Sequence, residues 1–174
     1  ASSARGVRLG PALLSLAAAA RFEIAEAARE TLTALSRDSG ETVDLSVVDN
    51  EKIVFVDQIA GTHRLAAISG LGVAFPLHSS ANGKAALAAM NEATLAKLKK
   101  KLVLTQLTAK TLTSWEALEG EIAEIRKIGI AYDREENSPG ISAIALSGTG
   151  PSGELAAISI PVPTQRFAEN DQTL

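Results

Sequence analysis

Two stretches near the end of the chain, 141–146 and 154–160, alternate large and small side chains with a period of two residues. This period is typical of β-strands, because successive side chains of a strand point to opposite faces of the sheet. The two faces would differ in side-chain size, with Ile144, Leu146, Ile158 and Ile160 on one and Ala143, Ala145, Ala157 and Ser159 on the other. The large face must pack on helices. The small face leaves either a closely packed element or an empty volume, and the alternation favours neither.

The rest of the chain predicts helices and strands in separate blocks. Helices are expected over 22–39, 81–90, 92–101 and 115–128, and further strands over 43–47, 53–56, 65–69 and 130–134. The strands 43–47 and 53–56 should form a hairpin, with 43–47 buried on one face only. This order of elements predicts the α+β class, with a mostly antiparallel sheet flanked by helices.

The stretch 75–89 places a loop of small polar residues directly before an alanine-rich helix. The first turn of a helix has backbone N–H groups without intrahelical partners, and the macrodipole adds positive potential at the same end. A carboxylate or phosphate binds well there, with Ser80 or Asn82 able to cap the helix. We therefore expect a pocket for a small anion at this helix start.

Composition excludes several classes of protein. A net charge of −3 and a pI of about 5.5 argue against a nucleic-acid surface within this chain. The chain has no cysteine and two histidines, so we expect neither a thiolate nor a histidine-rich metal site, and no cofactor. No apolar run reaches the roughly 18 residues of a membrane span, so we expect a cytoplasmic protein with no membrane partner.

Two motifs suggest chemistry that their context does not support. Residues 148–153 match the GxGxxG pattern of dinucleotide-binding loops, but they connect two predicted strands, so we expect a hairpin loop. The acidic run 133–136 lacks companion metal ligands and is expected to be a solvated strand end. No nucleophile–base constellation can be assembled, so the sequence predicts no catalytic residue.

Residues 1–20 are predicted to form an apolar helix. A helix that is non-polar on every face is stable only when it packs against something else, and a second copy of the chain is the expected partner. We therefore expect a homodimer or a tetramer, built from a chain that begins partway through a longer protein.

Four motifs, in order and at suitable spacing, resemble the IclR family of bacterial transcriptional regulators: Val7–Gly10, Pro76–Leu87, Gly129–Glu136 and Ala156–Ser159. The resemblance covers the family's effector-binding domain from near Val7 to the end of the chain. It implies a GAF-like domain over 21–174, with a curved antiparallel sheet flanked by helices, and a linker helix over 1–20. It also implies a winged helix-turn-helix domain, absent from this chain, which would bind operator DNA.

The resemblance further implies the residues of a ligand pocket. Ala81 and Asn82 match the helix-start residues whose backbone meets the ligand carboxylate, and Asp133 matches the acidic residue of the family's pocket. The remaining matches are strand positions and apolar lining: Ile141, Ala143, Ser159, Pro161, Ala67 and Phe75. Since several of these lie on the small-residue face, the resemblance supports an empty volume there.

Two pocket positions depart from a family member that binds small oxo-acids. In that member the positions matching Ala143 and Pro161 carry polar side chains, whereas alanine and proline side chains donate no hydrogen bond. Each missing donor should weaken the binding of such an acid by about 1–3 kcal/mol. We predict an aromatic or short aliphatic mono-carboxylate instead, because Asp133 would repel a second negative group.

The sequence is compatible with three alternative functions. The first is the sensing domain of a DNA-binding transcriptional regulator, in which a carboxylic acid changes dimer or tetramer geometry and operator affinity. The second is an enzyme that processes a small acid with Asp133 as base, and the third is a dimerisation module without a ligand. The sequence leaves open the identity of the effector, the operator, and whether the regulator represses or activates.

Overall fold

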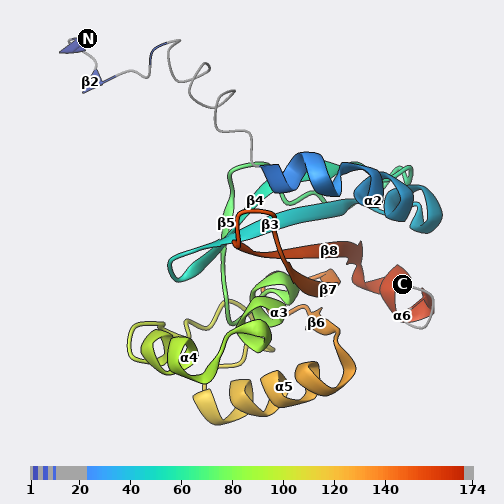
Figure 1. Ribbon diagram of the computed structural model, residues 1–174. Helices are drawn as coiled ribbons and strands as arrows, with labels where there is room; N and C mark the ends of the chain where they lie inside the picture. Colours follow the sequence, from blue (N-terminus) through green and yellow to red (C-terminus); the bar gives the residue numbers. More distant parts are fainter. Residues whose placement is uncertain (1, 4–5, 8–9, 11–22, 171–174) are drawn as a thin grey trace.

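The main sheet is antiparallel throughout and has six strands in the order β5-β4-β3-β8-β7-β6. The computed structural model describes residues 2–3, 6–7, 10 and 23–170 (Figure 1). The strands are β3 Val43–Asp49, β4 Lys52–Ile59, β5 Ala74–Pro76, β6 Ala131–Arg134, β7 Ile141–Thr149 and β8 Leu155–Pro163. The predicted α+β class is confirmed.

Helices lie on both faces of this sheet. Their bounds are α2 Glu23–Ser39, α3 Ala81–Ala89, α4 Glu92–Lys99, α5 Trp115–Ile128 and α6 Thr164–Asn170. Helix α2 covers one face, α3 lies against the other, and α4 and α5 form a layer beyond α3 (Figure 1). All four helices predicted within the described residues are confirmed, with ends shifted by one or two residues.

The face under α2 is filled by large side chains, as the alternation predicts. Ile144 and Ile160 pack into one cluster with Leu32 of α2 and with Leu45 of the neighbouring strand β3. Leu146 is the exception, because its side chain is 51% exposed.

The opposite face carries the small residues, and α3 approaches it closely. Ala143 and Ala145 of β7 form a cluster with Ala81 and Ala85 of α3. The register pairs Ala143 with Pro161 and Ala145 with Ser159, so these small residues of β7 and β8 face α3 together. Short side chains on both surfaces allow the helix backbone to lie near the strands.

Two sequence predictions about strands are wrong. Residues 65–69 form no strand: Leu65 and Ile68 are each 67% exposed, and the segment that does pair with this edge of β4 is β5, opposite Lys52–Val54. Strand β3 is not half-buried, since every residue from Val43 to Val47 is buried. It lies in the interior of the sheet, with α2 on one face and the pocket side on the other, which sequence alternation alone could not reveal.

The predicted helix over residues 1–20 lies largely outside the described residues. Ser2–Ser3 and Gly6–Val7 form a two-stranded antiparallel pair, so the prediction is wrong at those four positions. Serine and glycine have low helix propensity, which fits this local outcome. Gly10 is not helical either, and a linker helix remains a prediction for the residues of this segment outside the described part.

Candidate functional site

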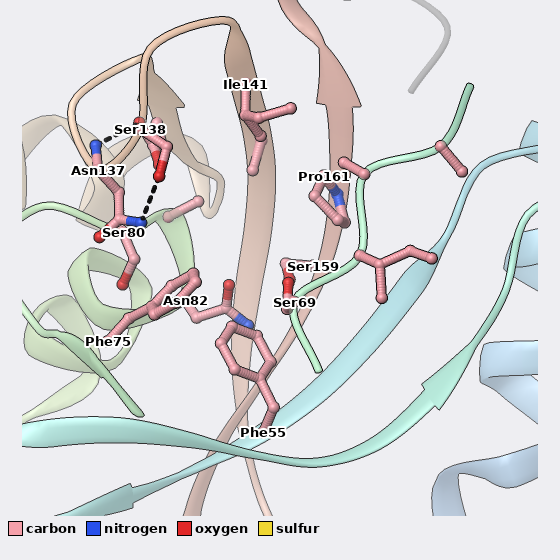
Figure 2. A pocket seen from close by; sticks show the side chains of 16 residues that line it. Phe55, Ser69, Phe75, Ser80, Asn82, Asn137, Ser138, Ile141, Ser159 and Pro161 are labelled. Carbon is pink, nitrogen blue, oxygen red and sulfur yellow. Dashed lines mark hydrogen bonds between the residues drawn. The ribbon is translucent and has the colours of Figure 1, made fainter. Parts of the chain in front are cut away.

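A pocket of about 270 Å³ lies between the start of α3, the small-residue face of β7 and β8, and the loop from β4 to β5 (Figure 2). The structure brings all nine predicted site residues together along its walls. They are Ala67, Phe75, Ala81, Asn82, Asp133, Ile141, Ala143, Ser159 and Pro161. The small-residue face is therefore closely packed where α3 covers it. Beside the first turn of α3 it leaves a cavity. The role of these residues in binding stays a prediction.

Seven further residues line the pocket and were missed in the sequence. They are Phe55, Ala66, Ile68, Ser69, Ser80, Asn137 and Ser138. Phe55 could have been found from strand alternation, because it pairs with Ser46 on the pocket side of β3. The loop residues 66–69 gave no such signal, because their place over the pocket depends on contacts with distant parts of the chain.

The first turn of α3 presents backbone N–H groups to the pocket. Ser80 is the N-cap, and its hydroxyl accepts a hydrogen bond from the Gly83 N–H at 3.2 Å. Among the described residues, the N–H groups of Ala81 and Asn82 have no acceptor within the protein. The first turn of α3 packs directly on the backbone of Leu77. This requires glycine at position 83, since a Cβ there would lie 2.3 Å from the carbonyl oxygen of Leu77. The expected anion site at this helix start is thus geometrically available.

The Asn82 side chain is held in place from β3. Its amide nitrogen donates to the Ser46 hydroxyl at 2.7 Å, and that hydroxyl donates to the carbonyl oxygen of Ala157 at 3.1 Å. Figure 2 shows the Asn82 side chain between Phe55 and Ser159 at the pocket wall. A buried amide fixed in this way adds a polar group to an otherwise largely apolar wall.

Asp133 is buried at the end of β6, contrary to the predicted solvated strand end. Its Oδ1 accepts hydrogen bonds from the backbone N–H groups of Glu136 at 2.7 Å and Asn137 at 3.4 Å. Burial raises the pKa of the Asp133 carboxyl to about 7, and the negative charge of Glu136 adds to the rise, while these backbone donors and Lys84 oppose it. Near neutral pH this group is therefore partly protonated and able to donate a hydrogen bond, so it repels a carboxylate less than the sequence suggested.

The loop from β4 to β5 closes one side of the pocket through polar contacts. The Ser69 hydroxyl donates to the buried Asp44 carboxylate at 2.5 Å. The Arg166 guanidinium of α6 donates to the carbonyl oxygen of Leu65 at 2.9 Å and also pairs with buried Glu41. These contacts tie the loop to β3 and α6 and keep Ala67 turned toward the cavity.

The pocket can bind a ligand, but it carries no assembled catalytic apparatus. Asp133 is the one titratable side chain among the pocket residues in the described part of the chain. In the same part of the chain, no cluster of three or more histidine, cysteine, aspartate or glutamate residues could hold a metal ion. A search of the described helices found none with the length and apolar character needed to cross a membrane.

The α+β fold is shared with the crystal structure of Thermotoga maritima IclR, with a TM-score of 0.85 and 32% identity over 92% of this chain and 66% of that chain. The family model for the bacterial transcriptional regulator IclR C-terminal domain matches residues 16–174. The chain belongs to the IclR family of bacterial transcriptional regulators.

Two further relatives define the extent of the match. The HTH-type transcriptional regulator Rv1719 of Mycobacterium tuberculosis (strain ATCC 25618 / H37Rv) is 45% identical over 165 residues, which cover 94% of this chain and 63% of that protein. The chain thus spans less than two thirds of the length of that relative. An inducer-binding domain of PobR from Acinetobacter, solved as a double mutant with 3-hydroxybenzoic acid, has a TM-score of 0.74 and 22% identity over 85% of this chain and 89% of that chain. That likeness shows the fold alone.

Proposed function

We propose that this domain binds a small mono-carboxylate in the pocket at the start of α3, with the acid group at the backbone N–H groups of Ala81 and Asn82. The observation that carries the proposal is the combination of these two unpaired donors with a wall made largely of apolar groups. A helix N-terminus favours an anion through its free N–H groups and its dipole.

The walls favour a ligand whose remainder is apolar. Phe55 and Phe75 meet edge to face, with ring centroids 5.0 Å apart, and Ala143 and Pro161 offer no side-chain donor. The volume of about 270 Å³ lies just below the range of roughly 300–1,000 Å³ usual for ligand sites, so the ligand should be small. We propose an aromatic or short aliphatic acid.

In the whole protein, ligand binding would alter the geometry of a homodimer or tetramer and so change its affinity for operator DNA. An N-terminal winged helix-turn-helix domain would contact the DNA, joined to this domain by a linker helix within residues 11–20. Such coupling requires that the acid bind one arrangement of subunits better than another. We assign no enzymatic role, because no histidine, cysteine or lysine accompanies Asp133 among the pocket residues.

A thermal-shift screen followed by calorimetry tests the proposal. Benzoate, 3-hydroxybenzoate and butyrate are compared with glyoxylate and pyruvate, since a ligand of the native state raises its apparent stability by about 2.7 kcal/mol at 100 times its Kd. We expect stabilisation by the larger acids. Binding of glyoxylate and pyruvate alone would contradict the predicted ligand class, and no stabilisation by any acid would favour the ligand-free dimerisation module.

Two variants locate the ligand. Asn82→Leu should abolish binding, because leucine at the second position of α3 blocks the N–H groups and removes the hydrogen bond to Ser46. Ala93→Leu is the matched control, since Ala93 holds the same position in α4 and is exposed. Equal affinity of the two variants for the acid would place the ligand elsewhere.

A further inference from the structure

Lys84 carries a charge at a position with no solvent exposure. Its side chain is 0% exposed, and it lies on α3 one residue after Gly83. Its ammonium donates hydrogen bonds to Glu136 Oε1 at 2.6 Å and to Glu121 Oε1 at 2.8 Å. A buried ammonium needs such partners, because its desolvation is costly unless it is paired and hydrogen-bonded. The helix that forms the anion site is thus bound to α5 and to the segment after β6.

Glu136 continues this connection into the pocket. Its backbone N–H donates to Asp133 Oδ1 at 2.7 Å, and its backbone carbonyl accepts from the Thr111 hydroxyl at 2.7 Å. The next two residues, Asn137 and Ser138, line the pocket. The position of Glu136 therefore decides where three pocket residues lie, and the Lys84 ammonium holds the Glu136 side chain.

We propose that Lys84 is a positioning residue of the pocket, which fixes the segment 133–138 against the start of α3 through Glu136. The inference rests on the proposed function for its effect on a ligand, since the ligand would lie between these two walls. Lys84 itself is absent from the pocket lining, so its influence passes through Glu136 and Asp133.

The charged groups around Asp133 act in opposite directions. Glu136 raises the pKa of Asp133 by its negative charge, and Lys84 lowers it by its positive charge. Glu121 faces Lys84 from α5, while Glu135 pairs with Lys110 at the surface. Removing Lys84 and removing the charge of Glu136 should therefore shift the ionisation of Asp133 in opposite directions.

A ligand-free measurement tests this prediction. Carbon-13 NMR follows the Asp133 carboxyl signal with pH in the full chain, with the signal assigned by its loss in Asp133→Asn. We expect Lys84→Met to move the midpoint above the wild-type value of about 7 and Glu136→Gln to move it below. If Lys84 only maintained the fold, both variants would loosen the segment, expose Asp133 and lower the midpoint toward its ordinary value of 3.8. That result, or an unchanged midpoint in both variants, overturns the proposal.

Two further variants test the proposal if Lys84→Met alone does not fold. Lys84→Met combined with Glu136→Gln removes both opposing charges and should give a midpoint between those of the two single variants, whereas a midpoint near 3.8 contradicts the proposal. Glu121→Gln is the matched control, because Glu121 also bonds Lys84 but does not line the pocket. Its shift should be smaller than that of Glu136→Gln, and an equal or larger shift contradicts the connection through Glu136.

The two proposals fail separately. An acid screen without a hit would overturn the proposed ligand function. The NMR midpoints would still test the role of Lys84, because they are measured without a ligand. Midpoints that do not separate would overturn the role of Lys84 and leave any bound acid in place.

Discussion

The two faces of the sheet are made by the same strands, yet they differ in what fills them. Under α2, Leu45 of β3 and Ile160 of β8 pack against Leu32, which has no exposed surface. On the α3 side, the alternate positions carry Ser46, Ala143 and Ser159, and a cavity of about 270 Å³ remains. Side-chain size at every second position therefore decides which face of this sheet becomes core and which becomes pocket.

Polarity separates the faces as well. Both sides contain apolar clusters, but the α3 side also buries Asp44, Asn82, Lys84 and Asp133 around the pocket. Buried polar groups contribute little net stability even when paired, and they become costly when one partner is lost. We therefore expect the α2 side to contribute stability alone and the pocket side to carry the ligand response.

The largest effect is expected on the α2 side. Leu32→Ala should lower the free energy of unfolding by about 2–5 kcal/mol, because it removes a fully buried side chain and leaves a cavity. Urea denaturation measures the loss. Leu65→Ala is the control: this leucine is 67% exposed, and its replacement should change stability by less than about 0.5 kcal/mol. Similar losses in both variants would contradict the assignment of the core.

The next effect concerns Asp133 and depends on pH. The pKa of Asp133 is raised from 3.8 to about 7 in the folded protein, so the folded state holds a proton that the unfolded state releases. Stability from this group is present below pH 3.8 and is lost as the pH rises through about 7. Asp133→Asn keeps the acceptor for the Glu136 N–H and should stabilise the protein by about 1–4 kcal/mol at pH 8.

Urea melts of wild type and Asp133→Asn at pH 5, 6, 7 and 8 measure this difference. A gap that widens with pH is expected, and a constant gap would contradict the raised pKa. The affinity of wild type for a carboxylate ligand should also fall above pH 7, because an ionised Asp133 repels it.

Ala143 and Ala145 of β7 test which part of the small-residue face is closely packed against α3 and which part borders the cavity. Ala145→Leu should cost about 1–3 kcal/mol of stability, because Ala145 packs with Ala81 and Ala85 of α3. Ala143→Leu should cost less, since Ala143 packs on α3 but also lines the pocket, which can take up the added atoms, and it should abolish acid binding. Denaturation and calorimetry on both variants provide the measurement. The reverse order of stability would show that the cavity does not extend to Ala143.

The smallest effect is expected at the helix caps. Ser80→Ala should destabilise the protein by about 0.5–2 kcal/mol and weaken acid binding, because the first turn of α3 loses its cap at the pocket. Ser114→Ala removes the corresponding cap of α5, so it should cost a similar amount of stability and leave acid binding unchanged. Weaker acid binding in Ser114→Ala would argue that overall stability, and not the local geometry of α3, controls the site.

Much of the fold follows from local sequence. Period-two alternation correctly placed β7 and β8, helical spacing placed α2 and α5, and Gly40 and Gly129 end those helices with φ near +72° and +80°. The prediction failed for 65–69, where apolar residues form a loop beside the pocket. Polar contacts hold this loop instead of strand pairing, since Ser69 donates to Asp44 and the Leu65 carbonyl accepts from Arg166.

By itself, the sequence determined which residues share a strand face, because this depends on spacing along one chain, and it indicated which helix start could receive an anion. The family resemblance added the nine pocket positions. Only the tertiary structure decided that Lys84 is buried and that the pKa of Asp133 is raised to about 7. Lys84 meets Glu136 across 52 residues of sequence, and burial together with this neighbouring charge pair sets the ionisation of Asp133. Desolvation and charge pairing depend on distance in space, so no local pattern could encode them.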